Sequence, residues 1–291
     1  MALTSDEIRQ IRSLQIQLRR KVDSPFAGQY RSAFRGQGME FEEVRPYLPG
    51  DDIRHIDWNV TARARAPFVK QFREERELNL LLMLDVSGSM YFGSGGHDGR
   101  TDKRLQVARL AGALAYAAIS NRDRVGMLAF SDRVEHYLPP RRSRGHAWAV
   151  IRAAFEHQAL HRNTDLAAVL EHAGRILKRR SVICLFSDFD SPAGSSWSQP
   201  LAVLSRRHQV SCFLVHDPLE SRAMPGGLLE LEDAETGASR LVDSSALSAR
   251  VPLSMRLRSL RRSGAWCSEI STESDPFQQL LQHFQRMDRA R

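Results

Sequence analysis

The sequence predicts an α/β fold, in which a doubly wound, mostly parallel sheet is flanked by helices. Four short apolar runs are almost unbroken, which is typical of parallel strands covered on both faces; they lie at residues 78–84, 125–130, 182–186 and 210–215. Amphipathic segments with helical spacing separate these runs. Strands that alternate with helices of this length favour an open sheet with right-handed crossovers.

The expected helices are defined by apolar residues that return to one face every three or four positions. They lie around residues 107–118, 166–177, 253–260 and 277–284. After the fourth strand-like run, the stretch Glu230–Val242 has a Thr-Gly pair at its middle. Such a pair between β-like pieces predicts a hairpin near the edge of the fold.

The chain is expected to have two parts, with a boundary before the first apolar run. Residues 1–77 form an N-terminal helix and a small β-rich flank, and residues 78–291 form the main domain with C-terminal helices. Thr4 and Glu7 have the spacing of a capping box ahead of the N-terminal helix.

The flank over residues 23–77 is rich in charged and turn-forming residues. It has β-like pieces near 39–44 and 68–72, and we interpret it as a compact unit rather than a linker. Its aromatic residues, among them Tyr30 and Trp58, are expected to supply a small core. Its interleaved charges are expected to form a structural network of salt bridges.

Composition excludes several classes of protein. The 291 residues carry 42 basic against 34 acidic side chains, a formal charge of +8, but the charges are interleaved along the chain. Nucleic-acid binding proteins concentrate basic charge more strongly, so no nucleic-acid partner is expected. No run reaches the roughly 20 apolar residues of a membrane helix, and the start lacks the features of a secretory signal. Three cysteines without metal-like spacing indicate buried free thiols, so we expect a cytoplasmic protein.

Oxygen-bearing side chains gather at the predicted strand ends. Asp85, Ser87 and Ser89 follow the first strand, Thr164 directly precedes a helix, and Asp188 follows the strand at 182–186. These are the five candidate ligands. Ligands collect at the carboxyl ends of parallel strands, so we expect the five to converge. Two carboxylates and three hydroxyls suit Mg²⁺, which prefers oxygen ligands and retains open coordination positions. The absence of His and Cys from the set argues against zinc.

The pattern Asp-x-Ser-x-Ser, followed by Thr164 and Asp188, resembles the metal-ion-dependent adhesion site of von Willebrand factor A-type domains. The resemblance covers residues 78 to roughly 270 and implies a Rossmann-like sheet. It also implies that the three hydroxyls bind the cation and that the two carboxylates bind it directly or through water. A carboxylate from a partner would complete the shell. Mg²⁺ is the expected cofactor, with Mn²⁺ or Ca²⁺ as alternatives.

The flank carries a second resemblance. Its motifs are Gly36–Phe41, Arg45, Tyr47, Pro49–Asp52, Arg54, Ile56–Trp58 and Thr61–Arg63. They are similar to a bacterial family catalogued as domain of unknown function 58, whose members carry the A-type domain and are commonly encoded beside MoxR-type AAA+ ATPases. The resemblance implies a MoxR-type AAA+ ATPase as partner, in a complex that remodels client proteins or inserts cofactors into them.

Two structural alternatives concern the candidate ligands themselves. The residues from Asp85 to Ser89 also suit a polar turn that caps the next helix, and Asn163 or Thr164 also suits the N-cap position of the helix that follows. The glycine-rich run at 93–101 has Arg100 where a phosphate loop needs lysine, so nucleotide hydrolysis is not expected.

The function predicted from these residues is a non-enzymatic, metal-dependent protein-interaction module. The alternative is a metal-assisted hydrolase that acts on phosphate or acyl groups, in which the cation activates water or Ser87 attacks. Such a hydrolase needs a general base, and no histidine is predicted at the strand ends.

Overall fold

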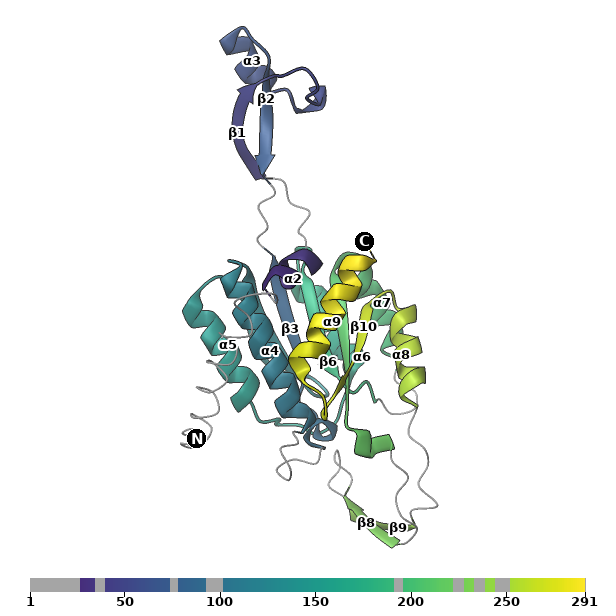
Figure 1. Ribbon diagram of the computed structural model, residues 1–291. Helices are drawn as coiled ribbons and strands as arrows, with labels where there is room; N and C mark the ends of the chain where they lie inside the picture. Colours follow the sequence, from purple (N-terminus) through teal and green to yellow (C-terminus); the bar gives the residue numbers. More distant parts are fainter. Residues whose placement is uncertain are drawn as a thin grey trace. The chain divides into compact units, whose positions relative to one another are not determined.

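The structure, a computed structural model, describes residues 27–34, 40–73, 78–92, 102–190, 196–221, 228–232, 239–243 and 252–290 (Figure 1). It divides the chain into two compact units, one of them Phe34–Leu78 and the other made of Met1–Ala33 together with Asn79–Arg291. The capping box expected at Thr4 and Glu7 lies outside the described residues. Within the described residues, no helix is both long enough and apolar enough to cross a membrane.

Six strands form the central sheet of the larger unit. In spatial order they are β10 (Trp266–Ser271), β7 (Gln209–His216), β6 (Val182–Ser187), β3 (Asn79–Asp85), β4 (Arg124–Phe130) and β5 (Val134–Arg141). All neighbours are parallel except β4 and β5, which are antiparallel. The chain enters at β3 and builds the sheet outward in both directions, which is the order of a doubly wound fold. The predicted fold class is confirmed.

Helices cover both faces of this sheet (Figure 1). They are α2 (Ala27–Ala33), α4 (Lys103–Ser120), α5 (Arg144–Glu156), α6 (Leu166–Ile176), α7 (Ser198–Arg207), α8 (Leu253–Arg262) and α9 (Pro276–Arg289). On one side α4 packs against α5 and α9, and α2 packs against α9. On the other side α6, α7 and α8 cover a core that includes Leu81, Ile183 and Leu214. The sheet is therefore dry on both faces, as its apolar strands predict.

The register of the central strands fixes where the strand-end residues lie. Leu84 of β3 pairs with Phe186 of β6, and Asp85 pairs with Phe130 of β4. Because these strands are parallel, the residues that follow them leave the sheet at one edge. We call this the carboxyl edge; it positions the turn after β3 beside the turn after β6.

Among the described helices and strands of the larger unit, β5, β10, α2, α5 and α7 were not predicted from the pattern. The residues of β5 are mostly half-buried and include Pro139 and Pro140, which are tolerated in an edge strand. The two strands of the expected hairpin are present as β8 (Leu228–Glu232) and β9 (Ser239–Asp243), paired antiparallel. All three cysteines are free, as predicted.

The smaller unit is built on an antiparallel pair, β1 (Glu40–Pro46) and β2 (Phe68–Arg73), with η2 (Ile53–His55) and α3 (Trp58–Ala64) between them. The predicted β-like pieces are confirmed. The expected aromatic core is wrong for two of its members. Trp58 is 70% exposed, and Tyr30 belongs to α2 of the larger unit, where its ring lies 6.2 Å from that of Phe284.

Charged side chains organise the smaller unit. The guanidinium of Arg45 donates two hydrogen bonds of 2.7 Å to the carboxylate of Asp51 and thereby holds the pKa of Asp51 at about 2. Asp57 caps α3 by accepting hydrogen bonds from the N–H groups of Asn59 and Val60. These motif residues therefore have structural roles, which agrees with the predicted salt-bridge network.

Gly126 lies where β4 passes close to β5. A Cβ atom here would lie 2.6 Å from the carbonyl oxygen of Leu138 and 2.6 Å from the backbone nitrogen of Pro140. We expect Gly126→Ala to lower the free energy of unfolding by about 1–3 kcal/mol, because backbone atoms cannot rotate away. Gly145→Ala is the matched control, since nothing lies within 4 Å of the Cβ added there. Equal urea midpoints for the two variants would contradict the prediction.

His283 of α9 is buried against the sheet. Its ring nitrogens lie 2.7 Å from the hydroxyl of Ser268 in β10 and 3.0 Å from the hydroxyl of Ser211 in β7. Burial, with a smaller contribution from Arg286, lowers the pKa of His283 to about 3. A depressed pKa means that the stability contributed by the neutral ring is present above about pH 6.5 and is lost as the pH falls. We expect a loss of up to about 1.4 kcal/mol per pH unit below that point. Urea denaturation as a function of pH measures it, and His283→Gln should show a shallower slope.

Candidate metal centre

The turn that follows β3 gathers three of the five candidate ligands. Asp85 ends the strand, and Ser87 and Ser89 lie on either side of the first residue of η3 (Gly88–Tyr91). The backbone N–H and the hydroxyl of Ser87 both donate to Oδ1 of Asp85, at 3.0 and 2.6 Å. The hydroxyls of Ser87 and Ser89 are 3.3 Å apart. All three side chains are buried, so the turn concentrates oxygen atoms in a dry place.

Asp188 reaches the same place from β6. The hydroxyl of Ser187, the last residue of that strand, donates to Oδ2 of Asp85 at 2.6 Å and so joins the two strand ends. Asp188 follows directly, is 1% exposed, and accepts a hydrogen bond from Ser89. The structure therefore brings four of the candidate ligands into one cluster.

Thr164 lies in the segment that leads into α6. The N–H of Gly88 donates to the carbonyl of Arg162 at 2.8 Å, which holds this segment against the turn after β3. Thr164 is buried. The N-cap of α6 is Asp165, whose carboxylate accepts the N–H of Ala168. The alternative in which Asn163 or Thr164 caps the helix is therefore wrong.

The two carboxylates have different electrostatic surroundings. Burial, followed by the nearby charge of Asp188, raises the pKa of Asp85 to about 7, although hydrogen bonds from Ser187 and Ser87 oppose the shift. Burial would also raise the pKa of Asp188, but the ammonium of Lys103 and the hydrogen bonds to Asp188 hold it below its usual value. Two buried carboxylates thus share the carboxyl edge. Of these two, Asp188 is the one that contacts the ammonium of Lys103.

Lys103 is the residue at this site that the sequence patterns missed. It is the first residue of α4, is 0% exposed, and its ammonium lies 2.8 Å from Oδ2 of Asp188 and 2.6 Å from Oε1 of Glu220. Glu220 belongs to η4 (Pro218–Ser221), which follows β7. The chain has four lysines among 42 basic residues, so a lysine at a helix start, where acidic residues are favoured, is the signal that was available.

Two further residues fix the backbone beside Asp188. Arg256 of α8 is buried and donates to the carbonyl oxygen of Asp188 at 2.7 Å. Phe189 has φ of 51° and a buried ring that lies 5.5 Å from the ring of Trp197. A left-handed conformation is unfavourable for such a residue by roughly 1–2 kcal/mol. Packing against Trp197 therefore holds a strained turn that aims Asp188 at the cluster.

The donor set fits a hard divalent cation. It offers two carboxylates and three hydroxyls, all buried at one edge of the sheet. Within the ranges that the structure describes, no three of His, Cys, Asp and Glu converge as metal ligands. A cation at this site would therefore depend on the hydroxyl oxygens as much as on the carboxylates.

The hydrogen bonds of the Ser87 hydroxyl bear on the hydrolase alternative. Its hydrogen bonds among the described residues go to Asp85 and Ser89. A histidine, His216, does end β7 at the carboxyl edge, but no described hydrogen bond joins it to Ser87. Among the described residues, the hydroxyl of Ser87 is therefore paired with a carboxylate and not with a histidine.

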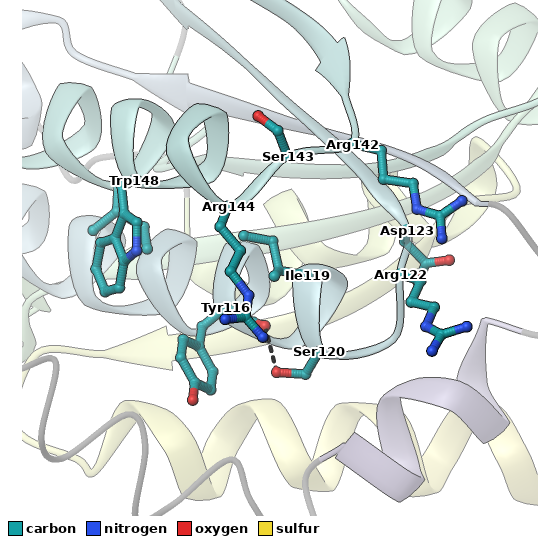
Figure 2. A pocket seen from close by; sticks show the side chains of 10 residues that line it. Tyr116, Ile119, Ser120, Arg122, Asp123, Arg142, Ser143, Arg144 and Trp148 are labelled. Carbon is teal, nitrogen blue, oxygen red and sulfur yellow. Dashed lines mark hydrogen bonds between the residues drawn. The ribbon is translucent and has the colours of Figure 1, made fainter.

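A cavity of about 720 Å³ lies away from the candidate metal centre, beside the start of β4 and the end of β5 (Figure 2). Its wall includes Arg122, Arg142 and Arg144, together with Tyr116 and Trp148. None of the candidate ligands lines it. This cavity is thus separate from the strand-end cluster.

Similar proteins were found by sequence. Residues 43–262 match the family described as "Protein of unknown function DUF58". The uncharacterized protein Rv1480 of Mycobacterium tuberculosis is 30% identical over 274 residues, which cover 91% of this chain and 84% of the relative. The uncharacterized protein Mb1516 of Mycobacterium bovis matches to the same extent.

Solved structures were also found, and the first of the two described here shows the same fold. The conserved hypothetical protein BatB from Bacteroides thetaiotaomicron has a TM-score of 0.50 at 16% identity, covering 73% of this chain and 99% of that one. A von Willebrand factor type A protein from Catenulispora acidiphila has a TM-score of 0.45 at 13% identity, covering 76% of this chain and 43% of that one. With its strand order and its sequence match over three quarters of its length, the chain belongs to the DUF58 family.

Proposed function

We propose that the candidate metal centre holds a divalent cation of the Mg²⁺ type and serves as a metal-dependent protein-interaction site. The observation that carries the proposal is the burial of Asp85 and Asp188 beside three hydroxyl groups. Burying two carboxylates together is unfavourable unless positive charge balances them, and of these two carboxylates it is Asp188 that pairs with Lys103. A cation at the site would offset the burial and, after it, the charge of Asp188, which together raise the pKa of Asp85.

The candidate ligands have two kinds of role in the proposal. Ser87, Ser89 and Thr164 supply neutral oxygen atoms, and Asp85 and Asp188 supply negative charge. Three neutral and two charged donors leave a Mg²⁺ ion short of a full octahedral shell. When bound, the cation would offer the remaining position to an acidic side chain of another protein.

The partner that we propose is a MoxR-type AAA+ ATPase, in a complex that remodels a client protein or inserts a cofactor into it. The support for this partner is the family membership and the flank motifs, which resemble proteins encoded beside such ATPases. The interaction is proposed to be non-enzymatic; the support is that the described hydrogen bonds of the Ser87 hydroxyl join it to Asp85 and Ser89 and not to a histidine. Turnover of phosphoester or ester substrates that is lost in Ser87→Ala would support the hydrolase instead.

Mg²⁺ should stabilise the folded protein. At ten times its Kd, a cation that binds only the folded state adds about 1.4 kcal/mol, which corresponds to a rise in Tm of roughly 3–6 °C. Thermal unfolding with Mg²⁺ and with EDTA measures the shift. Asp85→Asn and Thr164→Ala should abolish it. Asp132→Asn is the matched control, because Asp132 follows β4 at the same edge but pairs with Arg133. A shift that survives in Asp85→Asn would place the cation elsewhere.

Partner binding should depend on the cation. We expect the protein to co-purify with the MoxR-type ATPase of the same genome in Mg²⁺ and to lose it in EDTA, because the cation bridges the two proteins. Asp85→Asn should lose the ATPase under both conditions. Co-purification that is equal in Mg²⁺ and EDTA would show that the contact does not involve the metal centre.

A further inference from the structure

Lys103, the first residue of α4, lies in a buried network of ion pairs. Its ammonium contacts Asp188 at 2.8 Å and Glu220 at 2.6 Å, and all three side chains are almost fully buried. Placing an ammonium out of water is unfavourable unless it is paired and hydrogen-bonded. Both carboxylates supply that pairing, so the position of Lys103 is explained by Asp188 and Glu220 together.

The helix itself gains nothing from this lysine. Lys103 is the first residue of α4, where the positive end of the helix dipole makes a positive charge unfavourable. The cap of the helix is Asp102, whose carboxylate accepts the N–H of Leu105. The ammonium therefore serves the carboxyl edge and not the stability of the helix.

Asp188 is the point at which an ammonium and a divalent cation would meet. Its Oδ1 accepts the N–H of Asp190 at 3.2 Å, and its Oδ2 accepts from Lys103. A cation coordinated by Asp188 would lie within a few ångströms of the ammonium, since both contact one small carboxylate. Two positive charges at that separation, in a region with little water, repel each other strongly.

Glu220 gives the ammonium a second place to go. It approaches the ammonium closely, and it lies in η4, which is fixed to the sheet through Asp217. Asp217 accepts the N–H of Leu219 at 2.8 Å and the hydroxyl of Thr272 at 2.7 Å. Lys103 can therefore lose Asp188 to a cation and remain paired with a well-anchored carboxylate.

We propose that Lys103 is an internal cation that competes with the divalent metal for Asp188, and that Glu220 sets the strength of this competition by holding the ammonium away. The inference rests on the proposed metal centre and adds the residues that determine its affinity. By reciprocal linkage, any partner that draws Glu220 away from Lys103 lowers the affinity for metal, and any partner that engages η4 through Glu220 changes the occupancy of the site.

Charge-matched variants separate direct competition from simple net charge. Three carboxylates (Asp85, Asp188 and Glu220) and one ammonium give the ionised wild-type group a formal charge of −2. Glu220→Gln makes it −1 and leaves the ammonium with Asp188 alone. Lys103→Met makes it −3. The double variant returns it to −2 but removes the competing ammonium.

The experiment is calorimetric titration of the full chain with Mg²⁺, repeated with Mn²⁺. We expect Glu220→Gln to weaken binding at least threefold and the double variant to tighten it at least tenfold relative to the wild type. Lys103→Met should bind most tightly where it folds. If it does not fold, the double variant carries the test, because it removes the ammonium together with the carboxylate of Glu220 that the ammonium balances. Lys178→Met, at an exposed lysine, is the control and should match the wild type.

The outcomes distinguish this inference from the proposed function. If no variant and no wild-type sample binds either cation, the proposed metal centre fails and the inference fails with it. If all of them bind with the same affinity, the metal centre stands and the role of Lys103 is overturned. An affinity order that follows net charge alone, with the double variant equal to the wild type, would also overturn it.

Discussion

The candidate site depends on one constraint: Asp85 and Asp188 are buried side by side at the edge of a dry sheet. The parallel register of β3 and β6 places both residues there, and helices on both faces exclude water. Carboxylates in that position need hydrogen bonds and positive charge. The serine hydroxyls and the ammonium of Lys103 meet parts of that need. A bound cation would supply the positive charge that these groups do not.

Much of the larger unit could be predicted because its strands are apolar throughout. A run such as Val182–Phe186 is typical of a strand covered on both faces, and the alternation of such runs with helices then predicts a mostly parallel sheet. The edge strand β5 escaped prediction because half-buried residues and two prolines resemble a loop. The prediction of an aromatic core in the flank was wrong for a related reason. Composition indicates that the ring of Tyr30 is buried, but it does not indicate which unit buries it.

The candidate ligands could be found from sequence because each directly follows or precedes a regular element. Lys103 could not, because its partners lie 85 and 117 residues further along the chain and no short motif joins them. Spacing predicts contacts within one turn or between adjacent strand ends. It does not predict which long side chain from a neighbouring helix fills the space between them.

The prolines of β5 have a consequence for how other proteins can approach. Among the described strands β5 is the last of the sheet, and Pro139 and Pro140 each lack the backbone N–H group that other residues of a strand can donate. An incoming peptide that tried to extend the sheet along this strand would find gaps in its ladder of hydrogen bonds. Association by strand addition is discouraged along this border, which also guards the protein against uncontrolled self-assembly.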